Sequence, residues 1–380
     1  MPSRLDLRLD RTDIGLARVA RRAARPLATR SGRRPATRTG PGRSVPGAGR
    51  PDAERRRFAG PVRRPHRRTP VDRRSDATVR RRGDRRRRPV ESRTSADRTG
   101  RPPRRLSLRN RVPLPMPELP EVERGRLVAE MVALDRTIRR VRCAPDRIVF
   151  CDQTPTTVSR RLKGRTVAAA CRHGKQLWLE FDDGPALLLH FGMTGALHGY
   201  QHESDRPRFW KIELEFEDGR RLAMPDPRRF GRIRLRDDPR REPPISDLGF
   251  DPLLDLPGKA DFRERIGRGT VSIKGRLLDQ RFAAGVGNWI ADEILYQARV
   301  APQRRVRDLD PEEIERIRRR LGSIVEKAVE VNSVSSRFPR GWLFHRRWGR
   351  PEDATTARGE SIEIGTVAGR TTAWVPSVQR

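Results

Sequence analysis

The sequence predicts an α+β protein of several domains: a β-rich domain, a helical domain and a carboxy-terminal hairpin, preceded by an arginine-rich segment without structure of its own. Three observations predict this organisation. Short strand patterns separated by turn residues fill residues 138–236, helical patterns fill 259–331, and residues 1–115 contain too few apolar side chains to build a core. A chain of 380 residues is long enough for two or three domains.

The charge of the chain is strongly positive and unevenly placed. There are 85 Lys+Arg residues against 49 Asp+Glu, a formal net charge of +36. Residues 1–115 hold 36 arginines, no lysine and 10 acidic residues, so this segment alone carries +26. Such charge indicates a polyanionic partner, above all nucleic acid.

Two classes of protein are disfavoured by composition. The three cysteines, Cys143, Cys151 and Cys171, have no paired spacing, which argues against a disulfide scaffold and fits a reducing compartment. The sequence also has no apolar run long enough to cross a bilayer and no apolar centre of a secretory signal.

The segment 1–115 is predicted to be disordered. It consists mainly of Arg, Pro, Gly, Ser and Asp, and runs such as Arg85–Arg88 have neither helical nor strand periodicity. It could be a basic arm that binds DNA without sequence preference, or it could be absent from the working protein. We favour the second interpretation, because its lack of lysine differs from the rest of the chain and because the chemistry discussed below requires it.

The β-rich part begins with a helical pattern at Glu123–Leu134, whose apolar residues fall on one side. Strands are then expected at Ile138–Val141, Thr166–Cys171, Gln176–Phe181, Ala186–Phe191, Trp210–Phe216, Arg221–Met224 and Arg232–Arg236. Seven short strands at this spacing predict a sandwich or a barrel.

Residues Pro239–Pro257 are predicted to be a linker to the helical part. Helices are expected at Lys259–Gly267, Ile273–Gln280, Asn288–Gln297 and Pro311–Val331, and Asp310 has the position of an N-cap for the last of them. In the tail, Ser361–Val367 and Thr371–Val375 flank Ala368-Gly369-Arg370, which predicts a β-hairpin.

The stretch Met-Pro-Glu-Leu-Pro-Glu-Val-Glu at residues 116–123 has the clearest catalytic potential. Once Met116 is removed, Pro117 presents a secondary amine, which can attack an electrophilic sugar carbon and form an iminium. Glu118 is well placed for proton transfer beside it. The same stretch could be an ordinary turn that leads into a helix at Val122, so motifs elsewhere in the chain have to decide.

Four further motifs point to nucleic acid. The turn Gly285-Val-Gly287 before Asn288 would let backbone amides approach a phosphate at a helix amino end. Phe-Gly-Met-Thr-Gly at 191–195 and Asp-Pro-Arg-Arg-Phe-Gly at 226–231 expose apolar and cationic side chains suited to wedging into a base stack. Arg-His-Gly-Lys at 172–175 is a basic turn entering a strand. Each motif alone could equally be a plain surface or interhelical turn.

Taken together, and with Gly-Arg-Thr-Thr at 369–372, these motifs resemble the formamidopyrimidine-DNA glycosylase family in both order and approximate spacing. The resemblance covers 116–380 and leaves 1–115 outside. It implies a catalytic two-sheet β-sandwich at 116–240, a helix–two-turns–helix DNA-binding domain at 241–336 and a hairpin finger at 337–380. Leu119 after Glu118 is similar to the formamidopyrimidine branch, because the endonuclease VIII branch typically has glycine there.

The resemblance also implies residue roles. Pro117 would be the nucleophile, Glu118 the acid and base, Lys175 the basic residue that binds the phosphate beside the lesion and aids catalysis, and Glu121 the residue that orients the amino end. Met193, Arg228 and Phe230 would fill the gap left by a flipped nucleotide. The expected ligands of backbone phosphates are His190, Arg229, Lys274, Asn288 and Arg370. Arg370 would lie at the tip of the hairpin and is expected to be a catalytic residue as well.

The implied function is a DNA glycosylase and AP lyase of base excision repair, which forms a Schiff base on Pro117 and cuts by β- and δ-elimination. Its partner would be damaged double-stranded DNA, with the enzyme a monomer in the cytoplasm at the bacterial nucleoid, or in a nucleus, and without a membrane. The alternatives are an endonuclease VIII-like enzyme for oxidised pyrimidines, a damaged-DNA-binding protein without catalysis, and a ribosomal or nucleoid-type protein whose arginine-rich arm carries the affinity.

The finger departs from the usual pattern of its family. Family members commonly bind zinc there through two Cys-x-x-Cys pairs, but no cysteine follows Cys171, and Glu352 and Asp353 are the only potential ligands where the first pair belongs. The finger therefore resembles the zincless type of plant and fungal members, with Trp348, Trp374 and Val375 expected to pack in place of the metal. No cofactor is expected.

Two further expectations concern substrate and maturation. The stretch Val331–Arg337 is short where many bacterial members have a longer loop that covers 8-oxoguanine. We therefore expect formamidopyrimidines and hydantoins to be better substrates than 8-oxoguanine. We also expect the active enzyme to begin at Pro117, because the nitrogen of an internal proline is a tertiary amide and cannot form an iminium.

Overall fold

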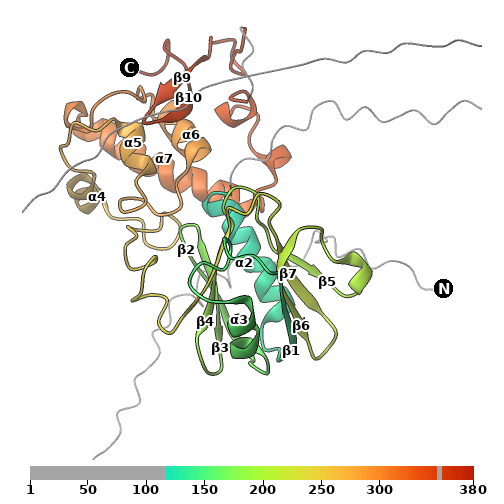
Figure 1. Ribbon diagram of the computed structural model, residues 1–380. Coiled ribbons are helices and arrows are strands. Elements are labelled where there is room, and N and C mark those ends of the chain that lie inside the picture. Colours follow the sequence, from blue (N-terminus) through green and yellow to red (C-terminus); the bar gives the residue numbers. More distant parts are fainter. Residues whose placement is uncertain (1–116, 349–352) are drawn as a thin grey trace, which may run out of the picture. The chain divides into compact units, whose positions relative to one another are not determined.

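The computed structural model describes residues 117–348 and 353–380 (Figure 1). The predicted disorder of 1–115 therefore lies outside the described residues. Within the described part of the chain, no helix is both long and apolar enough to cross a bilayer.

The β-rich part forms two antiparallel sheets of four strands, so the sandwich is confirmed and the barrel is not (Figure 1). One sheet has the order β1-β6-β7-β5, with β1 Ile138–Cys143, β6 Trp210–Phe216, β7 Arg221–Pro225 and β5 His198–Tyr200. The other has the order β2-β3-β4-β8, with β2 Val167–His173, β3 Gln176–Phe181, β4 Ala186–His190 and β8 Arg232–Arg236.

Helix α2, Leu119–Ala133, belongs to two hydrophobic cores. Val122 and Ala129 pack in the sandwich core with Phe216 and Leu177. Leu119, at the first turn of the same helix, packs instead in the core of the helical part. The amino-terminal motif therefore lies where the two cores meet.

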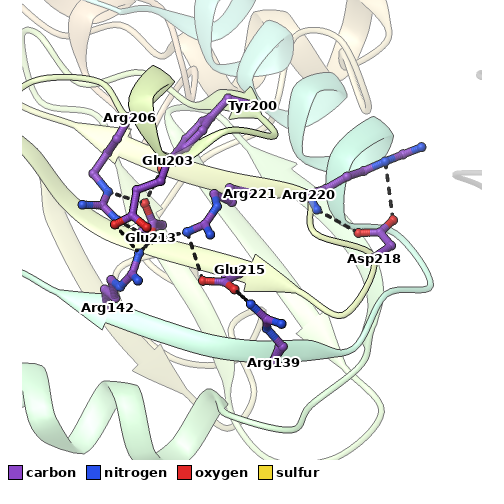
Figure 2. A network of polar contacts seen from close by, with 10 residues as sticks. All are labelled: Arg139, Arg142, Tyr200, Glu203, Arg206, Glu213, Glu215, Asp218, Arg220 and Arg221. Carbon is purple, nitrogen blue, oxygen red and sulfur yellow. Dashed lines mark hydrogen bonds and ion pairs between the residues drawn. The ribbon is translucent and has the colours of Figure 1, made fainter.

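An arginine–glutamate network covers the outer face of the β1-β6-β7-β5 sheet (Figure 2). Glu213 on β6 has no exposed surface and accepts hydrogen bonds from Arg206 Nε at 2.6 Å and Arg142 Nη1 at 2.7 Å, and also from the hydroxyl of Tyr200. Burial raises the pKa of Glu213, but the bonds from Arg206, Tyr200 and Arg142 outweigh burial and lower the pKa to about 2. The network keeps this face polar and charged.

The helical part contains α4 Lys259–Ile266, α5 Ile273–Leu278, α6 Asn288–Ala298 and α7 Pro311–Glu330. Asp310 caps α7 as predicted, because its side chain accepts from the amides of Glu312 at 2.8 Å and Glu313 at 2.7 Å. Trp289 on α6 belongs to the core of this part and is fully buried.

The carboxy-terminal hairpin is confirmed as β9 Glu363–Val367 paired with β10 Arg370–Trp374. Before it, the 3-10 helices η3 Ser335–Arg337 and η4 Leu343–His345 bring aromatic side chains onto Trp289. The ring of Phe344 lies 5.2 Å from that of Trp289 and 5.4 Å from that of Trp348, both edge-on. Val375 has no exposed surface and packs with Leu343, Ile362 and Ala373.

One predicted helix start and one predicted linker were wrong, and two elements were missed. Helix α2 begins at Leu119 rather than near Val122, because Pro120 is tolerated in the first turn of a helix. Helix α3, Pro155–Leu162, and strand β5 were not predicted. The segment Pro239–Pro257 is not a free linker, because Phe250 and Asp251 within it are buried.

Candidate active site

The Glu118 carboxyl group lies at the amino end of helix α6. One oxygen, Oε2, accepts from the amides of Gly287 at 2.8 Å and Ile290 at 3.2 Å, and the other, Oε1, accepts from the amide of Trp289 at 2.9 Å. The first amides of a helix have no partner within the helix, and the helix dipole favours a negative charge beside them. The carboxyl group thus satisfies three backbone donors that lie between 169 and 172 residues further along the chain.

Glycines in the turn before α6 make this approach possible. A Cβ atom on Gly287 would lie 2.3 Å from Cδ of Glu118, so no side chain fits there. Gly285 has a φ of +94°, which favours glycine, and its carbonyl accepts from the amide of Leu119 at 3.1 Å. The Gly-Val-Gly turn thereby holds the Pro-Glu-Leu segment by its backbone.

The Glu118 side chain has only 2% of its surface exposed, and burial raises its pKa to about 7. The cation of Lys175 opposes this rise, Glu121 adds to it, and the amides of Trp289 and Ile290 oppose it. A carboxyl group with a pKa near neutrality can both donate and accept a proton under physiological conditions.

Glu121 joins the amino-terminal segment to the end of α7. Its Oε2 accepts from the amide of Glu118 at 3.0 Å, and its Oε1 accepts from the hydroxyl of Ser333 at 2.5 Å. Burial raises the pKa of Glu121, while the Ser333 hydrogen bond acts in the other direction. Pro117 directly precedes this clamp and is half-buried.

Lys175 lies at the same place, in the turn between β2 and β3. Its Nζ donates to the carbonyl of Val286 at 3.0 Å. Burial lowers the pKa of Lys175, Glu118 and Glu121 raise it, and Arg370 lowers it further. Arg370, at the start of β10, therefore acts electrostatically on the same group, and the structure brings Glu118, Glu121, Lys175 and Arg370 together as the sequence suggested.

A buried ion cluster, missed by the sequence analysis, supports the turn that carries Lys175. Arg172 donates to Glu123 Oε2 at 2.8 Å and to both oxygens of Asp251. Asp251 also accepts from the amide of Gly174 at 2.7 Å, and His173 Nε2 lies 2.8 Å from the carbonyl of residue 249. The sequence signal for this cluster is an acidic residue within the apolar stretch Leu-Gly-Phe-Asp-Pro-Leu, which lies in the segment predicted to be a linker.

Lys274 is not placed as a solvent-facing phosphate ligand. Its ammonium group is fully buried and pairs with Asp292 Oδ1 at 2.6 Å, while it donates to the hydroxyl of Thr372 at 2.7 Å. Arg347 pairs with the other oxygen of Asp292 at 2.6 Å. In this structure the three charges tie α5, α6 and the hairpin together, because a buried cation requires a buried counter-charge.

The remaining predicted phosphate ligands differ in their surroundings. Asn288 donates through Nδ2 to the carbonyl of residue 371 at 2.8 Å. Nδ1 of His190 accepts a hydrogen bond from the amide of Gly192 at 3.2 Å. Burial, together with the cation of Lys175, lowers the pKa of His190 to about 4. At neutral pH the ring is therefore uncharged, and its Nε2–H is a neutral donor. Arg229 is exposed and pairs with Asp146 at 2.9 Å and 3.1 Å.

The predicted wedge residues lie on two turns of the sandwich. Phe230 is 46% exposed, and the guanidinium of Arg228 lies 5.1 Å from its ring centroid, a cation–π contact. Met193 is half-buried on the turn 191–195. The turn 191–195 lies directly against the backbone of residues 230–231. Only glycine fits at position 192, because a Cβ on Gly192 would lie 2.4 Å from the carbonyl carbon of Phe230. The two turns therefore meet.

The sequence and the structure both match known proteins. Residues 116–233 match the family model of the formamidopyrimidine-DNA glycosylase N-terminal domain, and residues 248–340 match that of the H2TH domain of the same family. A formamidopyrimidine-DNA glycosylase of Arabidopsis thaliana is 39% identical over 278 residues, which covers 70% of this chain and 71% of the relative. One of Thermus thermophilus is 36% identical over 276 residues, covering 70% of this chain and 98% of the relative.

Among solved structures, the formamidopyrimidine-DNA glycosylase of Lactococcus lactis, bound non-covalently to DNA that contains an AP site, superposes with a TM-score of 0.61. It is 25% identical and covers 69% of this chain and 99% of its own. The two family models follow each other in the order of the sandwich and the helical part. The chain therefore belongs to the formamidopyrimidine-DNA glycosylase family.

Proposed function

We propose that this protein is a DNA glycosylase and AP lyase of base excision repair, which removes oxidised purines through a Schiff base on Pro117. The observation that carries the proposal is the position of Glu118: its carboxyl group, with a pKa of about 7, sits beside Pro117 at the amino end of α6 and near Lys175. Burial raises the pKa of Glu293 to about 7 as well, and that side chain only accepts structural hydrogen bonds such as the one from the amide of Phe344. It is therefore the place of Glu118 next to Pro117 that a damaged-DNA-binding protein without catalysis would not need.

In the proposed reaction the Pro117 nitrogen attacks C1′ of the damaged nucleotide. The bond from C1′ to the base breaks, and the base leaves with the proton that the Pro117 nitrogen gives up. Glu118 gives a proton to the sugar ring oxygen, the ring opens, and an iminium joins Pro117 to C1′. The positive iminium makes the C2′ proton acidic. Loss of that proton breaks the bond from C3′ to oxygen and expels the 3′ phosphate. Loss of the C4′ proton then breaks the bond from C5′ to oxygen and expels the 5′ phosphate.

DNA would be held by cations and neutral donors around this centre. Lys175 and Arg370 supply positive charge close to Glu118, and His190 and Asn288 supply neutral donors. Met193, Arg228 and Phe230 would occupy the space left by the extruded nucleotide, an extrusion that costs a few kcal/mol. The enzyme would act as a monomer on damaged double-stranded DNA, in the nucleoid or the nucleus.

The finger at 337–380 is proposed to be stable without zinc, and the reaction to need no cofactor. Packing supports this proposal, since Val375 is fully buried with Leu343 and Ala373 and since Trp348 packs on the Phe344 ring. The ring of Trp374 lies against the backbone at Gly365, where a Cβ would be 3.0 Å away. The buried pair of Lys274 with Asp292 adds a polar tie to the hairpin.

The short segment after α7 supports the proposed substrate preference for formamidopyrimidines and hydantoins over 8-oxoguanine. Asn332 and Ser333 both have positive φ, at 54° and 52°, and form a tight turn into η3 that leaves little length for a lesion-covering loop. A series of duplexes with one defined lesion each measures the preference. Equal or faster excision of 8-oxoguanine contradicts it, and activity confined to oxidised pyrimidines would point to the endonuclease VIII branch.

Borohydride trapping on abasic DNA tests the catalytic proposal. Protein that begins at Pro117 should form a covalent adduct, and the Pro117→Gly variant, which presents a primary amine in place of the secondary amine, serves as a partial-activity control. The intact chain 1–380, its mass confirmed, should form none, because its proline nitrogen is an amide. An adduct on the intact chain at a similar rate would remove Pro117 from the mechanism, and no adduct on either form would favour a binding protein without catalysis.

A further inference from the structure

A basic hollow lies between strand β1 and helix α3, away from the candidate active site. It has a volume of about 520 Å³ and is lined by four cationic side chains and two hydroxyls, those of Arg139, Arg140, Arg160, Lys163, Thr156 and Ser159. No acidic side chain lines it in the described part of the chain. We call this group of residues the β1–α3 hollow.

Two features of the fold gather these cations. The pairing of β1 with β6 shifts between Ile138, opposite Phe216, and Arg140, opposite Glu215, which marks a β-bulge. The bulge leaves Arg139 and Arg140 both exposed, although neighbouring residues of a regular strand point to opposite faces.

Helix α3 contributes the other wall of the hollow. Thr156, Ser159, Arg160 and Lys163 are spaced three and four residues apart, so they share one face of the helix. The opposite face, with Val158 and Leu162, is buried in the sandwich core. Burial of the apolar face therefore fixes the basic face against β1.

Most of the positive charge in the hollow is not neutralised by the protein. Arg139 pairs with Glu215 (Figure 2), and nearby Arg142 and Arg206 pair with Glu213. In contrast, Arg140, Arg160 and Lys163 have no carboxylate within 4.0 Å among the described residues, unlike Arg161, which reaches Asp237 at 3.7 Å. Three like charges around one depression repel each other, and a bound anion would relieve that repulsion.

The hollow lies at the end of the sandwich opposite the active site. Helix α2 runs 15 residues from Leu119, beside Glu118, and the chain then turns into β1. The amide of Gly164, just after α3, donates to the carbonyl of Ile138 at 2.9 Å, which fixes this end of α3 at the start of β1. At 1.5 Å per residue the two places are separated by about 20 Å, and α3 and β1 lie far from α5 and α6 in Figure 1.

We propose that the β1–α3 hollow binds the phosphate backbone of a second DNA segment while the active site holds the first. The proposal rests on the proposed function, from which the polyanion is taken to be DNA. The basic face of α3 from Thr156 to Lys163 extends about 10 Å, which matches about three base-pair rises of 3.4 Å along one strand. A protein with two such sites can pass between DNA segments without first dissociating.

The test uses protein that begins at Pro117, without the arginine-rich segment that could itself hold a duplex. This protein is first loaded with an unlabelled duplex that contains tetrahydrofuran, an abasic analogue that cannot be cut. Binding of a second, labelled and undamaged duplex is then measured at increasing salt. The hollow variant carries Arg140→Gln, Arg160→Gln and Lys163→Gln. The control variant carries Arg263→Gln, Arg268→Gln and Arg319→Gln, which remove the same charge from exposed positions of the helical part.

We expect the slope of log K against log salt for the second duplex to become shallower by about 2 to 3 in the hollow variant, because each phosphate that the protein neutralises adds about 0.9 to the slope. The control variant should keep the wild-type slope, and a variant with Arg140→Lys and Arg160→Lys should also keep it. Saturable binding of the first duplex should be unchanged in all variants. If the first duplex does not bind, the proposed function fails independently of the hollow.

Three outcomes overturn the proposal. The slope could be unchanged in the hollow variant, or the slope of the control variant could fall by as much. Finally, the hollow variant could lose binding of poly-glutamate or of inorganic pyrophosphate while it keeps the second duplex, which would assign the hollow to an acidic protein or to a small phosphate ligand instead.

Discussion

A single methyl group at Gly287 should disable the active site without unfolding the protein. In Gly287→Ala the new Cβ would lie 2.3 Å from Cδ and 2.5 Å from Oε1 of Glu118, whereas ordinary contacts begin at 3.4 Å. The carboxyl group therefore has to retreat by about 1 Å. The bonds to Gly287, Trp289 and Ile290, now 2.8, 2.9 and 3.2 Å long, would then exceed normal hydrogen-bond lengths.

The expected magnitude follows from this displacement. A misplacement of about 1 Å at a reacting group can cost about 100-fold in rate. Each hydrogen bond to a charged group is worth about 1.5–3 kcal/mol, and water can replace part of that loss once the carboxyl group moves. We expect borohydride trapping on abasic DNA to slow about 100-fold, with the optimum of its pH profile shifted to higher pH, because Glu118 loses amide donors that lower its pKa.

Gly341→Ala is the matched control, because a Cβ on Gly341 meets nothing within 4 Å. It should trap at the wild-type rate and unfold at the wild-type denaturant concentration. A Gly287→Ala protein that is folded by circular dichroism, traps as fast as wild type and keeps its pH profile would refute the assignment of Glu118 as the acid and base.

Three other predictions follow from the same contacts. Burial raises the pKa values of Glu118 and Glu293 to about 7, so the folded protein holds protons that the unfolded chain releases above pH 4.5. The free energy of unfolding should therefore fall as pH rises from 4.5 to 7, by up to about 3 kcal/mol for each group. Urea titrations should find a smaller fall in Glu293→Gln, and an equal fall would count against the raised pKa of Glu293. Asp251→Ala leaves the buried guanidinium of Arg172 and the amide of Gly174 without their acceptor, so we expect the free energy of unfolding in urea to fall by about 3–5 kcal/mol. Trapping should also slow, because the turn that carries Lys175 is loosened, and unchanged trapping would exclude a positioning role for Asp251. Phe230→Ala should change the free energy of unfolding by no more than about 0.5 kcal/mol, because the ring is half exposed. It should nevertheless slow base excision from a duplex more than nicking of a preformed abasic site, and equal slowing of both reactions would argue against a wedge role.

The sequence predicted most elements because their signals are local. Strand β3, Gln176–Phe181, has the predicted bounds, and the capping of α7 by Asp310 follows from residue types alone. Helix α3 was missed because it is short and its buried residues, Val158 and Leu162, complete little more than one turn of periodicity. Strand β5 has three residues and no alternation to read.

The candidate site was predictable only in part, because sequence signals are local and contacts between distant segments leave none. Motifs identified Glu118, Glu121 and Lys175, which the fold brings together from segments far apart in the chain. They could not reveal that Lys274 is buried, because its partner Asp292 is a tertiary neighbour from another helix. The ion cluster around Asp251 was hidden likewise, since nothing in a single sequence pairs it with Arg172.

Helix α2 has a consequence for damaged or unfinished copies of the enzyme. Leu119 is anchored in one hydrophobic core and Val122 in the other, and Glu118 obtains its amide partners only from α6 and the turn before it. A chain that has lost either core cannot assemble a carboxyl group of the required acidity next to Pro117. Under the proposed mechanism, strand cleavage would thus be restricted to intact molecules, and a partly folded copy that still binds DNA through its many arginines would leave the phosphodiester backbone uncut.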